Sequence, residues 1–122
     1  MSDILEFADQ FFNAVSRGDI VAVAGVYRDD VTVWHNFDNI DQSREDNLAT
    51  LAGISGRYDA FDYEDVRHTA LEDGFLRQHV IKATLGEKTV TVPAILRVYV
   101  EGDKIHRIEE YFDRGQLDAL FL

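Results

Sequence analysis

The segment YRDDVTVWHN, residues 27–36, decides the fold because the chain passes there from helical patterns to strand patterns. The part from Val31 to Trp34 is rich in β-branched and aromatic residues, which favour a strand. Asp29 and Asp30 before it are poor helix formers and predict the end of the preceding helix. We therefore expect helices on the N-terminal side of this segment and a sheet that begins inside it.

Two helices are predicted before this segment. In the first, apolar residues recur at helical spacing from Ile4 to Val15, and either Ser2 or Asp3 supplies the N-terminal cap. A second, shorter helix is expected from Ile20 to Tyr27. Each helix presents one apolar face, so both are expected to pack against the sheet that follows.

A third helix is predicted after the first strand. Residues 37–42 are polar and predict a loop. Ser43, with Asp46 three positions later, resembles a capping box and marks the start of the helix. Apolar residues recur within it at helical spacing, and we expect Gly53 and Gly56 to end it.

The rest of the chain predicts four long strands joined by tight turns of glycine and acidic residues: residues 58–69, 75–85, 89–100 and 104–112. Strands connected in this way pair with their sequence neighbours and form an antiparallel meander. Helices followed by such strands indicate an α+β fold. We expect a cone-shaped, curved, mixed or antiparallel sheet wrapped around the N-terminal helices, with a pocket at its open end.

Composition narrows the possible partners. The 122 residues fit one domain, residues 1–122, and they include no cysteine, so disulfide and thiol chemistry are excluded. The net charge of −11 opposes binding to nucleic acid and to anionic membranes. No basic run precedes an apolar stretch near the N-terminus, and no apolar run is long enough to span a membrane. We therefore expect a cytoplasmic protein.

Three stretches carry a resemblance to a known superfamily: AVSRGD at residues 14–19, YRDDVTVWHN at residues 27–36 and GDKIHRIEEYFDR at residues 102–114. Together with the order of predicted elements, they resemble the nuclear transport factor 2-like superfamily. The resemblance is to its SnoaL-like polyketide cyclases, ketosteroid isomerases and limonene epoxide hydrolases. It implies a pocket for a small apolar or aromatic molecule and a homodimer formed through the convex face of the sheet.

His35 is the first candidate catalytic residue. Side chains alternate along a strand, so Val33 and His35 share one face, and His35 is expected at its open end, looking into the pocket. Trp34 and Asn36 face the other way unless a bulge turns one of them inward. The resemblance places His35 where ketosteroid isomerases carry a carboxylate base and epoxide hydrolases an asparagine that holds water. An imidazole can act as a base near neutral pH. The alternative is a histidine that is hydrogen-bonded at a strand end.

Glu110 is the second candidate. By alternation it shares a face with Ile108 and Phe112, so its carboxyl group would be partly desolvated, which suits it to proton transfer. The resemblance places Glu110 where the epoxide hydrolases carry a catalytic aspartate. The alternative is that Glu109 faces inward and Glu110 faces water, because a shift of one residue exchanges the two faces.

His79 is the third candidate. It alternates with apolar residues of its strand and is expected to point toward the pocket, where it would pair with Glu110 or bind a substrate oxygen. The alternative is a core histidine with its hydrogen bonds satisfied. We expect the other two histidines, His68 and His106, on the surface.

The resemblance also bears on the residues that would bind an oxygen atom. It places Tyr27 in the hydrogen-bond network of the ketosteroid isomerases. The other two donors of that network fall at Phe11 and Ile95, which cannot donate, and this argues against steroid isomerisation. We predict a set of residues that bind the ligand along the pocket wall. They are Tyr27, Val33, Trp34, Asn36, Phe11, Ile95, Ile108 and Phe112. Other aromatic residues are predicted to be core or pocket wall, among them Phe37, Phe61 and Tyr63.

No cofactor or metal is expected, because the sequence has neither a phosphate-binding loop nor a pair of histidines at metal-ligand spacing. We expect an acid–base enzyme, namely an isomerase, dehydratase, cyclase or hydrolase of a cyclic or aromatic substrate. The alternative is a non-catalytic ligand-binding or dimeric assembly module of the same fold. Inward Glu109 together with His35 bonded to backbone would favour that alternative. A third reading is a protein–protein adaptor.

Overall fold

The computed structural model describes residues 3–122 and opens with two helices, α1 (Ile4–Arg17) and α2 (Ile20–Val26). Asp3 caps α1 by accepting a hydrogen bond of 2.9 Å from a backbone N–H of the first turn, as predicted. Ser2, the other predicted cap, lies outside the described residues. The predicted extents of both helices closely match those observed.

The first strand, β1 (Tyr27–His35), is longer than predicted because it begins directly after α2. Its first residue is the register partner of Ile105 in the last strand, and the register then shifts. The aspartates at positions 29 and 30 therefore lie in an irregular part of the strand and do not precede it. The predicted loop, residues 37–42, contains a two-residue strand, β2 (Asp41–Gln42), which pairs with β1.

The third helix, α3 (Arg44–Arg57), begins where the sequence predicts. Ser43 caps it by accepting a hydrogen bond of 3.2 Å from the backbone N–H of Asp46. Gly56 was correctly predicted to mark the end of the helix, because α3 ends one residue later, at Arg57. Gly53 does not end it, since glycine weakens an exposed helix but does not break its hydrogen bonds.

Four long strands and a short helical tail complete the chain: β3 (Ala60–Leu71), β4 (Gly74–Leu85), β5 (Lys88–Glu101), β6 (Lys104–Phe112), α4 (Arg114–Asp118) and the 3-10 helix η1 (Ala119–Phe121). The predicted antiparallel meander is confirmed, since β3, β4, β5 and β6 pair in sequence order. β1 then pairs in parallel with β6, and the six strands form one mixed sheet in the order β2-β1-β6-β5-β4-β3. The predicted α+β class is therefore confirmed.

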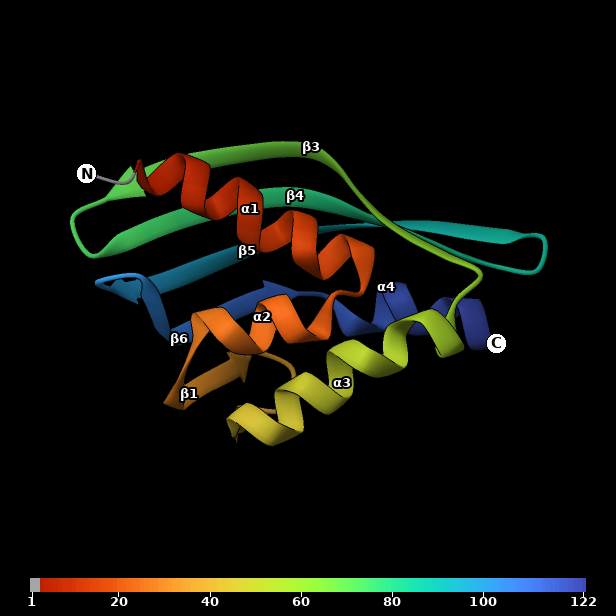
Figure 1. Cartoon of the computed structure of the whole chain (residues 1–122). Coiled ribbons are helices and arrows are strands. Elements are labelled where there is room, and N and C mark those ends of the chain that lie inside the picture. The colour runs from red at the N-terminus through yellow and green to blue at the C-terminus, as the bar shows by residue number, and fades with distance from the viewer. Residues whose placement is uncertain (1–2) are drawn as a thin grey trace.

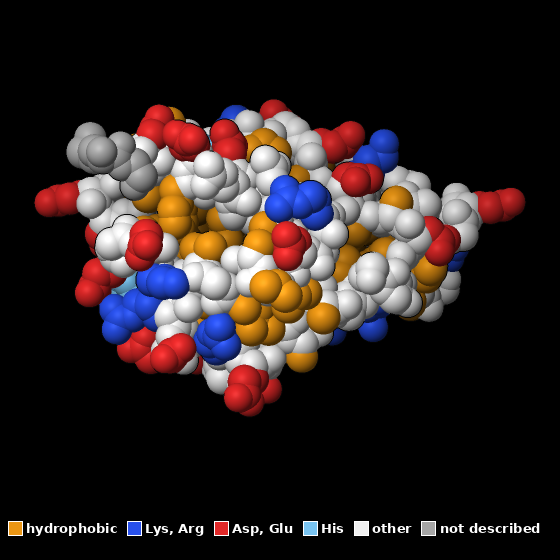
Figure 2. Space-filling view, in the orientation of Figure 1, with side chains coloured by type: hydrophobic (Ala, Val, Ile, Leu, Met, Phe, Trp, Pro, Cys, Tyr) orange, Lys and Arg blue, Asp and Glu red, His pale blue; other side chains and the backbone are white. Residues whose placement is uncertain are grey.

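The sheet curves around the helices without closing, and α1, α2 and α3 lie over one of its faces (Figure 1). Buried side chains from α1, α2 and the facing strands form the main core, which includes Phe11, Phe12, Val23, Phe75, Val98 and Ile105. Figure 2 shows hydrophobic side chains exposed between the helices on this side, surrounded by acidic and basic ones.

A bulge in β3 changes which side chains of this strand face the core. The pairing of β3 with β4 shifts by one residue between Glu64 and Arg67, and Asp65 within the bulge has a positive φ of 50°. One extra residue reverses the alternation of side chains beyond it. As a result Tyr63, before the bulge, and His68, after it, both lie over the inner face of β4.

Candidate functional site

A cavity of about 720 Å³ lies between the sheet, α3 and the C-terminal helix. Aromatic side chains form much of its wall, among them Phe37, Phe61, Tyr63 and Phe112, as predicted for these four residues. Leu51 and Ile54 of α3 cover it from the helical side. A volume of this size accommodates a small organic molecule, and such a wall favours a largely apolar one.

His35 and Glu110 form a hydrogen-bonded pair on the wall of this cavity. They are register partners on the parallel strands β1 and β6, and His35 Nε2 lies 3.0 Å from Glu110 Oε1. Their side chains are 12% and 17% exposed, so both are largely removed from solvent. A carboxylate only accepts hydrogen bonds, so in a pair of ionised Glu110 and neutral His35 the imidazole proton sits on Nε2 and the lone pair on Nδ1.

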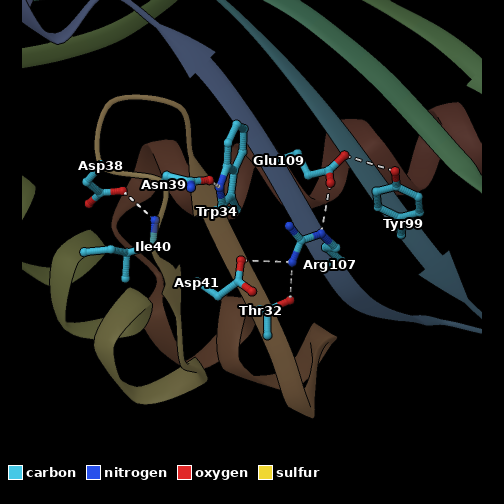
Figure 3. A network of polar contacts seen from close by, with 9 residues as sticks. All are labelled: Thr32, Trp34, Asp38, Asn39, Ile40, Asp41, Tyr99, Arg107 and Glu109. Carbon is cyan, nitrogen blue, oxygen red and sulfur yellow. Dashed lines mark hydrogen bonds and ion pairs between the residues drawn. The ribbon is translucent and has the colours of Figure 1, made fainter.

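Glu109 faces away from the cavity, which settles the strand register that the sequence left open. Its carboxylate accepts hydrogen bonds from the Tyr99 hydroxyl and from Arg107 Nε, each at 3.0 Å. Figure 3 shows these contacts on the outer face of the sheet, where Arg107 also reaches Thr32 and Asp41. Glu110 is therefore the inward glutamate, as predicted.

A chain of polar side chains joins the core to the cavity wall. The buried hydroxyl of Tyr27 donates a hydrogen bond of 2.7 Å to Asn47 Oδ1, and Asn47 Nδ2 donates one of 3.0 Å to Gln42 Oε1. Gln42 in turn donates to the Thr50 hydroxyl at 3.1 Å. Asn47, Gln42 and Thr50 all line the cavity, whereas Tyr27 supports them from behind.

Asn47 was missed by the sequence analysis. It is the buried residue of α3, yet asparagine is common on exposed helix surfaces. One signal was available: Asn47, Leu51 and Ile54 follow the spacing of one helical face, so a polar side chain stands on the face that turns inward.

The pair Arg77 and His79 lies behind the wall and outside the cavity lining. Arg77 Nε donates a hydrogen bond of 2.7 Å to His79 Nδ1, and the two residues are 3% and 2% exposed. His79 stacks on Tyr63 with 4.4 Å between ring centroids, so Tyr63 separates it from the cavity. Among the described residues His79 therefore contacts Arg77 and Tyr63, and no hydrogen bond or ion pair joins it to Glu110.

His68 is half-buried, contrary to the prediction that it lies on the surface. Its Nε2 accepts a hydrogen bond of 3.0 Å from Arg77 Nη1, and its Nδ1 lies 3.4 Å from a carboxylate oxygen of Asp9. The bulge at Asp65 turns His68 inward, and simple alternation along the strand could not reveal this. Burial and then the charge of Arg77 lower the pKa of His68.

The fold was compared with solved structures. A candidate polyketide cyclase from Xanthomonas campestris superposes with a TM-score of 0.83 at 17% identity, with 98% of this chain and 96% of that chain covered. A nuclear transport factor 2-like protein from Burkholderia xenovorans gives 0.76 at 18%, covering 96% and 94%. An LEH-like epoxide hydrolase from M. tuberculosis gives 0.77 at 21%, covering 97% and 89%. The chain has the nuclear transport factor 2-like fold.

At this level of identity the likeness concerns the fold alone. No protein-family model matches the sequence. No curated protein matches it either. The nuclear transport factor 2-like fold hosts many unrelated activities, so function must be argued from the residues around the cavity.

Within this nuclear transport factor 2-like fold, the other predicted ligand-binding residues divide into core and outer-face positions. Phe11, Val33 and Ile108 are buried in the main core, because side chains of α1 and of neighbouring strands cover them. Ile95 alternates with buried Ala94 and Leu96 and therefore faces the outer side of the sheet.

Trp34 and Asn36 also lie outside the cavity lining. The Trp34 indole N–H donates to Asn39 Oδ1 at 2.7 Å (Figure 3), and its ring packs against Tyr111 on the outer face. The Asn36 side chain accepts a hydrogen bond of 3.1 Å from the backbone N–H of Phe112. Regular alternation at the end of β1 thus holds, and no bulge turns either residue inward.

Two further observations concern residues 3–122. Within this part of the chain, no three His, Cys, Asp or Glu side chains cluster in a way that could hold a metal ion. No helix described here is both long enough and apolar enough to cross a membrane.

Proposed function

We propose that the protein binds a small, largely apolar molecule in its cavity and that His35 and Glu110 act on it by general acid–base catalysis. One observation carries the proposal. The imidazole and the carboxylate lie 3.0 Å apart, both are largely desolvated, and both line the same aromatic cavity. Paired titratable groups in a concave apolar site are a frequent feature of active sites.

The pair can move a proton without a cofactor. Nδ1 of the neutral His35 ring takes a proton from the bound molecule or from a water molecule, and the ring becomes an imidazolium. The Glu110 carboxylate, which already accepts the Nε2 proton, stabilises this positive charge and holds the ring in one tautomer. His35 then returns the proton to the product. This sequence suits isomerisation, dehydration, cyclisation or hydrolysis of a cyclic or aromatic substrate.

The comparisons support the class of substrate and not its identity. Proteins with this fold include a candidate polyketide cyclase and an epoxide hydrolase, and both of these activities concern small organic molecules. The alternative, ligand binding without turnover, was tied to an inward Glu109 and a His35 bonded to backbone. The observed Glu110 orientation and the His35–Glu110 bond favour the enzyme.

The proposal is tested by a turnover screen with a matched pair of variants. Purified protein is incubated with a panel of cyclic ketones, epoxides, phenols and lactones, and products are followed by mass spectrometry. We expect Glu110→Gln to abolish turnover, because glutamine cannot stabilise the imidazolium as a carboxylate does. Glu109→Gln changes the neighbouring, outward glutamate in the same way and should leave turnover intact. Equal turnover by both variants would reject the role of Glu110.

A further inference from the structure

Tyr63 lines the cavity, and residues 3–122 provide no hydrogen-bond partner for its hydroxyl group. The pKa of the Tyr63 hydroxyl is shifted by burial and by nearby charges. No hydrogen bond from any of residues 3–122 contributes to this shift. Tyr27, the other phenol close to Glu110, already donates to Asn47. The Tyr63 O–H group is therefore available to donate a hydrogen bond to a ligand.

The ring of Tyr63 is held by four neighbours, so its hydroxyl group points in a defined direction. The His79 ring stacks on it at 4.4 Å and an interplanar angle of 27°. The edges of Phe61 and Phe12 meet it at 5.8 Å and 6.2 Å, and the Arg77 guanidinium lies 5.0 Å from its centroid. A donor fixed in this way loses little conformational freedom when it binds a ligand.

Arg77 is a buried cation whose contacts need an explanation. Its hydrogen-bond partners are the rings of His79 and His68, and no carboxylate in the described part of the chain lies within ion-pair distance of it. Its guanidinium instead lies against the faces of Phe12 and Tyr63, at 3.9 Å and 5.0 Å. A cation over the face of a phenol withdraws electron density from the ring and makes its O–H a better donor.

The hydroxyl of Tyr63 stays protonated at physiological pH. Burial raises its pKa above 10 and the charge of Glu110 raises it further, while Arg77 acts in the opposite direction. The group can thus donate a hydrogen bond under all ordinary conditions.

We propose that Tyr63 donates the hydrogen bond that holds an oxygen atom of the bound molecule, with Arg77 and His79 as positioning residues behind it. The ligand is then an apolar ring system that carries a hydrogen-bond-accepting oxygen, such as a cyclic ketone. This inference rests on the proposed function because it uses the same cavity. It does not require turnover, so it can fail or succeed independently.

The test compares two probes, 1-indanone and indane, which differ in that a methylene group of indane replaces the carbonyl group. Dissociation constants are measured by ligand-observed NMR for wild type, Tyr63→Phe and Tyr111→Phe. Tyr111 is a phenol on the outer face of the sheet and serves as the control. We expect Tyr63→Phe to lower the preference for 1-indanone over indane by about tenfold, because a buried carbonyl loses its donor. The affinity for indane and the behaviour of Tyr111→Phe should not change.

Arg77→Gln tests the positioning role. Glutamine can still bond to His79 but has no charge, so we expect the preference for 1-indanone to fall about threefold with the indane affinity unchanged. A purely structural role for Arg77 would alter the affinity for both probes equally.

Four results would overturn the assignment of Tyr63. They are an unchanged preference in Tyr63→Phe, an equal weakening of both probes, the same loss in the control Tyr111→Phe, and no binding of either probe to wild type. The turnover of Glu110→Gln distinguishes the two proposals. If Glu110→Gln keeps the preference for 1-indanone but loses turnover, both proposals stand. If it keeps both, only the catalytic proposal fails.

Discussion

His35 Nε2 and Glu110 Oε1 lie 3.0 Å apart because the two residues are register partners on the parallel strands β1 and β6. Their sequence positions differ by 75. The pair therefore forms only when β6, the last strand of the meander, docks against β1. Formation of the site is thus coupled to completion of the sheet.

The His35–Glu110 bond should contribute to stability as well as to chemistry. We expect a coupling free energy of about 1–2 kcal/mol between His35→Gln and Glu110→Gln, because a largely desolvated bond to a charged group is worth this much. Chemical denaturation of wild type, both single variants and the double variant gives this value. Effects that simply add would show that the two side chains do not interact in solution.

The contact between Tyr27 and Asn47 predicts a second stability effect. Asn47→Leu removes the acceptor of a buried hydroxyl and should destabilise the protein by about 1–3 kcal/mol. In a Tyr27→Phe background the same change should cost less, because no hydroxyl is then left unsatisfied. Denaturation midpoints of the four proteins measure the difference, and an identical cost in both backgrounds would argue against the bond.

His79 predicts a pH dependence of stability. Burial, followed by the charge of Arg77 and the proximity of His68, lowers the pKa of His79 to about 3. In the unfolded chain the ring titrates near pH 6.5. Between these values the unfolded state binds a proton that the folded state does not, so the free energy of unfolding falls as the pH decreases from about 6.5.

The contribution of His79 is a slope of up to about 1.4 kcal/mol per pH unit below pH 6.5. His79→Gln, which can still accept the bond from Arg77, should lack this part of the slope. His106→Gln, which changes a histidine beside Tyr99 on the outer face, is the control and should keep it. Denaturation at pH 7 and pH 4.5 compares the three proteins, and equal slopes would contradict the prediction.

Gly74 predicts a backbone effect at the start of β4. A Cβ atom there would lie 1.9 Å from the backbone oxygen of Val98, which cannot move without disturbing β5. We expect Gly74→Ala to destabilise the protein by about 3 kcal/mol. Gly102 has a φ of 65°, but no atom lies within 4 Å of the position that a Cβ would take. Gly102→Ala should therefore lower the free energy of unfolding by only about 1 kcal/mol. Thermal denaturation ranks the two, and equal costs would argue against the close approach.

Alternation along regular strands made part of the site predictable. On β6 it placed Glu110 inward with Ile108, and on β1 it placed His35 with Val33, because both strands are regular near their ends. The aromatic pattern of Phe61 and Tyr63 also indicated a wall position correctly.

The remaining features depend on tertiary contacts that alternation does not encode. The bulge at Asp65 reverses the direction that alternation predicts for the His68 side chain. No local sequence pattern predicts a bulge in a polar strand. His79 was correctly placed on the inner face, but the tyrosine that stacks on it comes from another strand. The spacing of Asn47, Leu51 and Ile54 indicates the inward face of α3, but Asn47 lines the cavity only because of how α3 lies over the sheet.

The central claim is that His35 and Glu110 move a proton on a molecule in the cavity. The most direct measurement follows the exchange of acidic C–H protons in a panel of cyclic ketones dissolved in D2O, by 1H NMR, with wild type, Glu110→Gln and Glu109→Gln. We expect wild type and Glu109→Gln to accelerate exchange in at least one ketone, and Glu110→Gln to lose about 100-fold or more of that rate. No acceleration by wild type, or an undiminished rate in Glu110→Gln, would contradict the account.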